Sequence, residues 1–163
     1  MQAHTNIIRE AFDHSIPKVE KLDELIHSYG EEALEQLLLA LDDENALFRS
    51  MTLIYLGRMA DPRAVAPLIG FLHDQSRYDH YPRRQMSLRE RVWRYLSPWM
   101  RRIHQQILRD ERTLDLCGAS RALGKLGSTD AVEALECLCT DSEKKVRITA
   151  KEALAQIAAS SSS

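Results

Sequence analysis

An internal repeat constrains the fold of this 163-residue chain more than any other feature. The stretch that begins with Leu56-Gly57 recurs at Leu123-Gly124, and six positions (Leu, Gly, Ala, Val, Leu and Asp) are identical at a constant offset of 67 residues. Such a repeat is typical of stacked supersecondary units, each of which buries its apolar side only against its neighbours.

Two further copies fix the length of the unit. An earlier copy matches the first stretch at an offset of 31 residues, through Leu25, Ala33, Leu37, Leu41 and Asp43. A partial copy near the C-terminus pairs Arg49 and Leu56 with Arg147 and Leu154. The unit is therefore about 31 residues long, and the interval of 67 corresponds to two units plus five residues or to one unit plus an insert of 36.

Each unit is predicted to form two helices. In the first half, Leu53, Leu56 and Met59 follow helical spacing, and the Asp61-Pro62 step then breaks the chain, because proline suits the first turn of a helix. No segment alternates with a period of two, so no strand is predicted. The predicted helices cover residues 4–13, 18–29, 32–41, 46–59, 62–73, 88–96, 98–109, 113–126, 130–139 and 143–158.

The ten residues Leu56-Gly57-Arg58-Met59-Ala60-Asp61-Pro62-Arg63-Ala64-Val65 and their copy at Leu123 resemble the HEAT-like repeat first associated with phycobilisome lyases. In that family an arginine opens the first helix, Ala-Leu-Gly closes it, and Asp-Pro turns the chain; Arg49, Arg147 and Ala122-Leu123-Gly124 match this pattern. The third unit departs from it at Leu116 and at Ser128-Thr129. The resemblance covers residues 20–74 and 112–158 and implies mainly protein–protein recognition, with bilin attachment or removal as a specialised use.

We therefore expect an all-α fold, a short α-solenoid (HEAT-like superhelix) of about three and a half helical hairpins with one concave face. A single domain is expected over residues 1–159, with an insert at 75–110 and a disordered tail at 160–163. The repeat register predicts a set of buried leucines at Leu56, Leu68, Leu72, Leu123, Leu135 and Leu154.

The insert differs in composition from the rest of the chain. From Gln75 to Arg112 there are ten arginines, no lysine and four acidic residues, a net charge of +6, whereas twelve basic and twenty acidic residues give −8 elsewhere. Five of the ten aromatic residues also lie there. Arginine pairs with carboxylate or phosphate, and Trp and Arg are enriched at interface hot spots. The residues predicted to bind a partner are Arg91, Trp93, Arg94, Arg101 and Arg102. The alternative is an enlarged repeat with a solvated arginine face.

Candidates for metal binding or catalysis are weaker. Cys137-x-Cys139 with Cys117 and His104 are metal-ligand types, but the repeat alignment places Cys139 on Leu72 and Cys117 on Ser50, where helices pack. His73, Asp74, Asp79 and His80 have no recognised ligand spacing. Ser142-x-x-Lys145 lies where a helix N-cap is expected. No phosphate-cradling glycine loop or nucleophile elbow occurs. No metal, cofactor or catalytic residue is predicted.

Cellular context is predicted from what the sequence contains. Three cysteines do not make a disulfide framework, which favours a reducing compartment. The first ten residues lack the pattern of a signal peptide, and no apolar run reaches the roughly 18 residues of a membrane span. A cytoplasmic location is therefore expected.

Three functions remain open at this stage. The leading hypothesis is a non-catalytic adaptor or scaffold that binds one protein partner, acidic in character, through its concave face and the basic aromatic insert. A phycobiliprotein-directed bilin lyase or chromophore-handling factor is the enzymatic alternative implied by the resemblance. Nucleic-acid binding through the arginine-rich insert is the third, although the overall formal charge of −2 argues against extensive coating of nucleic acid.

Overall fold

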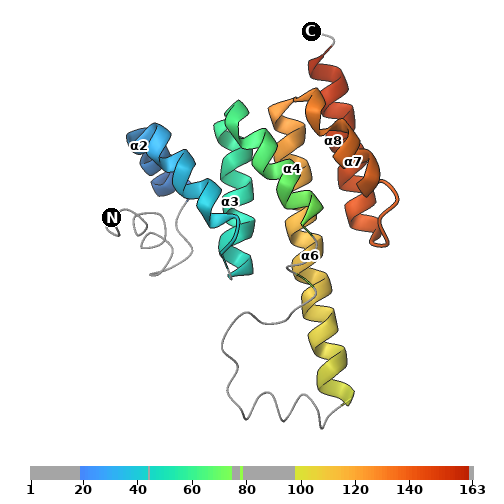
Figure 1. The fold of residues 1–163 in the computed structure, drawn as a ribbon. Coiled ribbons are helices and arrows are strands. Elements are labelled where there is room, and N and C mark those ends of the chain that lie inside the picture. The colour runs from blue at the N-terminus through green and yellow to red at the C-terminus, as the bar shows by residue number, and fades with distance from the viewer. Residues whose placement is uncertain (1–18, 44, 75–77, 79–97, 162–163) are drawn as a thin grey trace.

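The computed structural model describes residues 19–43, 45–74, 78 and 98–161, and every regular element in them is helical (Figure 1). The six α-helices are α2 (Val19–Ala40), α3 (Ala46–Met59), α4 (Val65–His73), α6 (Pro98–Leu126), α7 (Val132–Leu138) and α8 (Lys144–Ser160). Two short 3-10 turns, η1 (Pro62–Ala64) and η3 (Thr129–Ala131), lead into α4 and α7. No strand occurs in these ranges, which confirms the all-α prediction for them.

The helices pack in two layers. In the first, α6 lies between α3 and α8, and all three run in the same direction (Figure 1). In the second, α4 packs on α6 and contacts α7, while α2 packs on α3 and α7 on α8. We call these the α3–α6–α8 layer and the α2–α4–α7 layer. The first layer holds first helices of the repeat units, and α4, α7 and the part of α2 after Gly30 are second helices.

The first layer is held together by a contact that recurs from unit to unit. A methyl group added at Gly57 of α3 would lie 2.9 Å from the Cα of Ala122 on α6. A methyl group added at Gly124 of α6, the repeat equivalent of Gly57, would lie 2.9 Å from the Cα of Ala153 on α8. The glycine of each Leu-Gly pair therefore lets two neighbouring helices approach closely, so the sequence repeat is also a repeat in three dimensions.

The turn between the two helices of a unit also recurs. Asp61 caps η1 by accepting a hydrogen bond from the Arg63 main-chain N–H, with Pro62 in the first turn as predicted. Ser128, which replaces this aspartate in the later unit, accepts the same bond from Asp130. The residue directly after the preceding helix has a positive φ in both copies, 51° at Ala60 and 68° at Gly127.

The predicted register of buried leucines is confirmed at five of its six positions. Leu56, Leu68, Leu72, Leu123 and Leu135 all lie in the core. Leu154 is only half-buried and packs against the edge of that core.

The structure differs from the predicted helix boundaries in the second half of the insert. Instead of separate helices at 98–109 and 113–126, one helix of 29 residues runs from Pro98 to Leu126. Residues 110–112, Asp-Glu-Arg, contain no proline or glycine, so nothing interrupts the helix there. By contrast, Gly30 breaks α2 with φ 44°, which agrees with the two helices predicted on either side of it.

Other predictions fall at the edges of the described chain. The predicted helices at 4–13 and 88–96 lie outside the described residues. The tail was predicted from residue 160, whereas α8 continues to Ser160. Among the described helices, none is long and apolar enough to cross a membrane.

Candidate interaction surface

The long helix α6 contains the last part of the basic insert, residues 98–110. Its C-terminal half packs between α3 and α8, and its N-terminal half projects beyond the other helices (Figure 1). At 1.5 Å per residue the helix is roughly 43 Å long. Arg101 and Arg102 belong to its first two turns, although their side chains are outside the described part. Arg91, Trp93 and Arg94 lie outside the described residues, so their predicted role stays a prediction.

A buried ion pair holds α6 where the projecting half begins. Arg49 of α3 donates from Nε to Asp115 Oδ2 at 3.0 Å, and its Nη2 lies 2.9 Å from the same oxygen. The Asp115 side chain is fully buried and that of Arg49 is nearly so. Charged groups in such a place are costly unless they are paired, so this contact ties α3 to α6 in one arrangement.

The chain that leaves α4 is attached at the same point. The Tyr78 hydroxyl donates a hydrogen bond of 2.9 Å to Asp115 Oδ2. Glu111, one helical turn before Asp115, lies 3.7 Å from Arg49 Nη2. Burial raises the pKa of Glu111, and Asp115 raises it further, while Arg49 acts against both. The start of the insert and the base of its helix therefore meet on one buried carboxylate.

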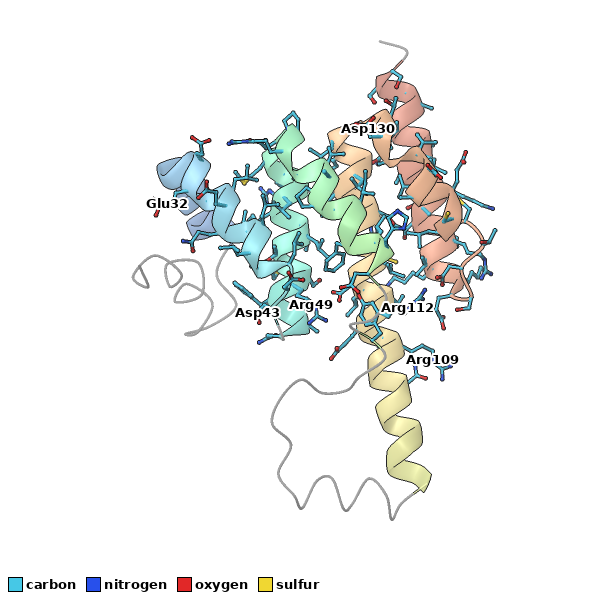
Figure 2. The ribbon with its side chains drawn as sticks, in the orientation of Figure 1. Glu32, Asp43, Arg49, Arg109, Arg112 and Asp130 are labelled. Atoms are coloured by element: carbon cyan, nitrogen blue, oxygen red, sulfur yellow. The ribbon has the colours of Figure 1, made fainter. Side chains whose placement is uncertain are left out.

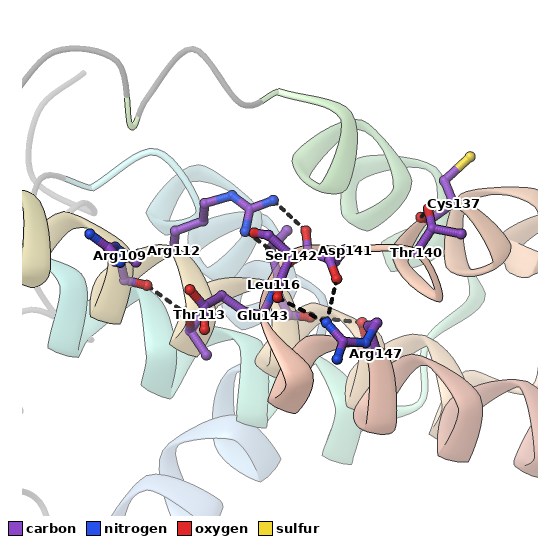
Figure 3. Close-up of polar contacts among 11 residues, drawn as sticks. Arg109, Arg112, Thr113, Leu116, Cys137, Thr140, Asp141, Ser142, Glu143 and Arg147 are labelled. Carbon is purple, nitrogen blue, oxygen red and sulfur yellow. Dashed lines mark hydrogen bonds and ion pairs between the residues drawn. The ribbon is translucent and has the colours of Figure 1, made fainter.

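A second set of ion pairs joins α6 to the turn before α8. Arg112 donates from Nη1 to Asp141 Oδ1 at 3.2 Å and from Nη2 to Asp141 Oδ2 (Figure 3). Burial alone would raise the pKa of Asp141, but the bonds from Arg112 and from the Glu143 main-chain N–H outweigh it and lower that pKa. The two-pronged geometry is characteristic of arginine with carboxylate and fixes the angle between the two groups.

The two arginines that match the family pattern make the same local contact. Arg49 Nη1 donates to the main-chain oxygen of Asp43 at 2.8 Å, and Arg147 Nη1 donates to that of Asp141 at 2.7 Å. In both turns the aspartate accepts a bond of 2.8 Å from the main-chain N–H two residues on. Figure 2 shows Asp43 and Arg49 close together at the start of α3. In both places the arginine therefore stabilises the turn before its own helix.

Exposed charge is divided between the two layers. On the described parts of α3, α6 and α8, seven exposed side chains are basic and two are acidic. On those of α2, η1, α4, η3 and α7, six are acidic and one is basic. The basic set is Arg58, Arg109, Arg121, Lys125, Lys144, Lys145 and Lys151, against Asp110 and Glu152. The acidic set is Glu31, Glu32, Glu35, Asp130, Glu133 and Glu136, against Arg63. The positive charge of the insert thus continues onto the layer that contains α6.

The cysteines occupy three different environments. Cys117 is buried, Cys139 is half-buried and Cys137 is exposed, and all three are free thiols. Cys117 and Cys139 are therefore packing residues, whereas Cys137, like its repeat equivalent Gly70, faces solvent. Within the described ranges no three metal-ligating side chains gather into a possible site. Ser142 precedes the N-cap of α8, which is Glu143, so the predicted cap is displaced by one residue.

Sequence reasoning singled out Arg49 but missed its partners. Asp115 falls on the buried stripe of α6 with Ala119 and Ala122, and a carboxylate on such a stripe is a signal of a buried ion pair. No comparable signal marks Tyr78, because the sequence around it has no helical periodicity.

No curated protein matches this chain. The family model of the PBS lyase HEAT-like repeat matches residues 115–136, which comprise the C-terminal part of α6, η3 and the start of α7. These are the residues that pack against both neighbouring units and hold the ion-paired base of the insert. Residues 115–136 are therefore similar to a PBS lyase HEAT-like repeat.

Proposed function

We propose that this protein is a non-catalytic adaptor that binds an acidic protein partner. The packed hairpins would form a short HEAT-like superhelix, and the partner would contact its concave face together with the basic aromatic insert. The residues proposed for the insert contact are Arg91, Trp93, Arg94, Arg101 and Arg102. Arginine would supply charge-assisted hydrogen bonds and tryptophan would supply buried area.

One observation carries this proposal: α6 extends well past the helical stack while its base is ion-paired to the units on both sides. Arg49 holds it from α3 through Asp115, and Asp141 holds it from the turn before α8 through Arg112. A helix that served only to connect two units would not need to project beyond them. A helix that presents a binding segment must be held at its base, because a loosely held segment loses more conformational entropy on binding.

The division of charge supports the acidic character of the partner. The basic side chains of the α3–α6–α8 layer lie on the same helix as Arg101 and Arg102 or on its neighbours. An acidic partner is attracted toward this side and repelled from the acidic side chains of the α2–α4–α7 layer. The proposal therefore predicts one orientation of the partner, with its acidic surface toward the insert.

The test begins with partners captured by cross-linking in cells of the source organism, and continues with the purified partner. Arg94→Gln with Arg101→Gln removes two positive charges from the insert. Ala66→Glu with Cys137→Glu changes the net charge equally at exposed positions of the other layer. We expect the insert variant to bind at least about thirtyfold more weakly, which is about 2 kcal/mol, and the control variant to bind nearly as tightly as the unaltered chain. The free energy of unfolding of both variants should lie within about 0.5 kcal/mol of that of the unaltered chain.

Equal affinity of the insert variant and the unaltered chain would contradict the proposed contact. Two further measurements on the same purified protein test the two alternative functions. Binding of a single-stranded oligonucleotide with a steep dependence on salt would favour nucleic-acid recognition. A visible absorption band that copurifies with the chain and is lost with the arginines would favour bilin handling.

A further inference from the structure

Among the side chains that the structure describes, each helix of the α3–α6–α8 layer has one large exposed aliphatic residue on the outer side. Ile54 of α3 is 46% exposed, Leu114 of α6 is 48% exposed and Ile148 of α8 is 46% exposed. Single exposed aliphatic residues are common on protein surfaces and mean little in isolation. Their positions relative to one another are what matters here.

The recurring glycine contacts align Ile54 with Ile148 across the layer. Gly57 lies opposite Ala122, so Ile54, three residues earlier, lies level with Ala119. Gly124 lies opposite Ala153, so Ala119 also lies level with Ile148. Because the three helices run in the same direction, Ile54 and Ile148 flank α6 at one height. Leu114 follows about one and a half turns below on α6.

Basic side chains surround this apolar row. Lys144 and Lys145 begin α8 at about the height of Leu114, while Arg121 and Lys125 follow on α6 above Ile54 and Ile148. Two exposed acidic residues described on these helices also lie near the row: Glu152 of α8, and Asp110, one helical turn before Leu114 on α6. An apolar centre with a charged rim is the usual composition of a recognition surface.

The position of the two lysines is unfavourable for the helix that contains them. They occupy the first turn of α8, which has no acidic residue, and the positive end of a helix dipole disfavours positive charge there. Folding alone would therefore select acidic residues at 144 and 145. Lysines at these positions have their advantage in the charge they present outward.

We infer that the outer side of the α3–α6–α8 layer binds an acidic amphipathic helix of a partner protein. The apolar stripe of that helix would cover Ile54, Leu114 and Ile148, and its carboxylates would pair with the basic rim. This inference rests on the proposed function, since it assigns a second contact to the same acidic partner. Arg101 and Arg102 lie about 18–20 Å along α6 from Leu114, so a partner helix of about 14 residues or more is needed to reach both contacts.

The first experiment measures binding of a fluorescein-labelled 18-residue peptide with leucines at helical spacing and glutamates elsewhere, by fluorescence anisotropy. A scrambled peptide of the same composition is the reference. We expect at least tenfold tighter binding of the amphipathic peptide. We expect Leu114→Ser with Ile148→Ser to remove most of that difference, whereas Leu39→Ser, at a 69% exposed position of α2, should leave it unchanged. Equal binding of the two peptides would overturn the inference.

The second experiment uses one double variant, Lys144→Glu combined with Lys145→Glu. The structure predicts that this double variant melts at a higher temperature, because it corrects the helix dipole, yet binds the peptide at least tenfold more weakly. The variant Ala66→Glu with Cys137→Glu, combined with Arg63→Glu, changes the net charge by the same amount on the α2–α4–α7 layer and should bind normally. Equal weakening in both would show that only net charge matters and would contradict the assigned surface.

Measurements with the purified partner separate this inference from the proposed insert contact. Loss of affinity in the Leu114 and Ile148 variant alone would support the surface and contradict the insert contact. Loss in the Arg94 and Arg101 variant alone would do the reverse.

Two other occupants of the surface are tested directly. Concentration-dependent sedimentation that is lost in the serine variant would assign the surface to a second copy of this chain. Flotation with phosphatidylserine vesicles but no peptide binding would assign it to a lipid surface. Either result would overturn the inference.

Discussion

Gly57 of α3 lies so close to Ala122 of α6 that a methyl group at residue 57 would come within 2.9 Å of the Ala122 Cα. The same relationship joins Gly124 to Ala153 one unit later. Real Cβ atoms do not approach a main-chain atom so closely, so the helices would have to separate. These two contacts fix how far each helix of the α3–α6–α8 layer is shifted along its neighbour. They thereby determine which residues meet at the base of the insert and on the outer surface.

Replacement of either glycine by alanine should therefore destabilise the protein. We expect Gly57→Ala and Gly124→Ala each to cost about 1–3 kcal/mol, the range for overpacked sites. Gly70→Ala is the matched control, because Gly70 is exposed within α4 and an added methyl group meets nothing within 4 Å. That change should stabilise the helix by about 0.5–1 kcal/mol. Urea unfolding of the three variants measures both effects, and a stable Gly57→Ala protein would show that the layer is looser than described.

The two positive-φ positions that follow α3 and α6 predict opposite effects of exchanging alanine and glycine. Ala60 has φ 51°, a left-handed conformation that costs an L-residue about 1–2 kcal/mol. Ala60→Gly should therefore raise the unfolding free energy by about 0.5–1 kcal/mol. Its repeat equivalent Gly127, with φ 68°, should lose at least as much on change to alanine, since the added methyl group would also lie 2.8 Å from Ser160 Oγ. A loss of stability in Ala60→Gly would be incompatible with the turn geometry.

The buried ion pair between Arg49 and Asp115 should be costly to break from either side. We expect Arg49→Ala and Asp115→Ala each to lower stability by about 3–5 kcal/mol, because each leaves a buried charge without its partner. The double variant Arg49→Met with Asp115→Leu removes both charges and should regain most of the loss. Chemical denaturation gives the three values. Additive losses in the double variant would mean that the two side chains do not act as a pair.

Stability should depend on the ionisation of Asp141 at acidic pH. Its pKa is lower in the folded protein than in the unfolded chain, so its contribution is present above the unfolded pKa of about 3.9 and is lost as pH falls through the folded pKa. Asp141→Asn should cost about 1.5–3 kcal/mol at pH 7, as for hydrogen bonds to charged groups. The gap between variant and unaltered chain should close below about pH 4, as followed by thermal melting in a pH series.

Glu111 should show the opposite sign. Burial raises its pKa in the fold, so its contribution is complete below the unfolded pKa of about 4.3 and declines as pH rises through the folded pKa. Glu111→Gln should therefore melt at a slightly higher temperature than the unaltered chain at pH 7 and at the same temperature near pH 3. A lower melting temperature at pH 7 would mean that the Arg49 contact outweighs burial.

Much of the fold could be predicted from the sequence because its determinants are local and repeated. The spacing of Leu56, Leu68 and Leu123 indicates which helix faces are buried, and burial of these residues confirms it. Asp61-Pro62 marks the turn, and the structure places its cap there. The helix boundary predicted at residues 110–112 was wrong. The sequence contains no helix-breaking residue there, but the repeat alignment favoured a boundary.

The sequence by itself determined the helical units, their buried faces and the turns within them, since spacing of three and four residues and turn chemistry act over short stretches of chain. Only the tertiary structure decided which units' polar residues meet. Arg49 and Asp115 are 66 residues apart, and no local pattern relates them. Their contact, and the alignment of Ile54 with Ile148 across α6, depend on how far one helix slides along the next. Close packing at Gly57 and Gly124 sets that distance, because it permits only one approach of the neighbouring helices.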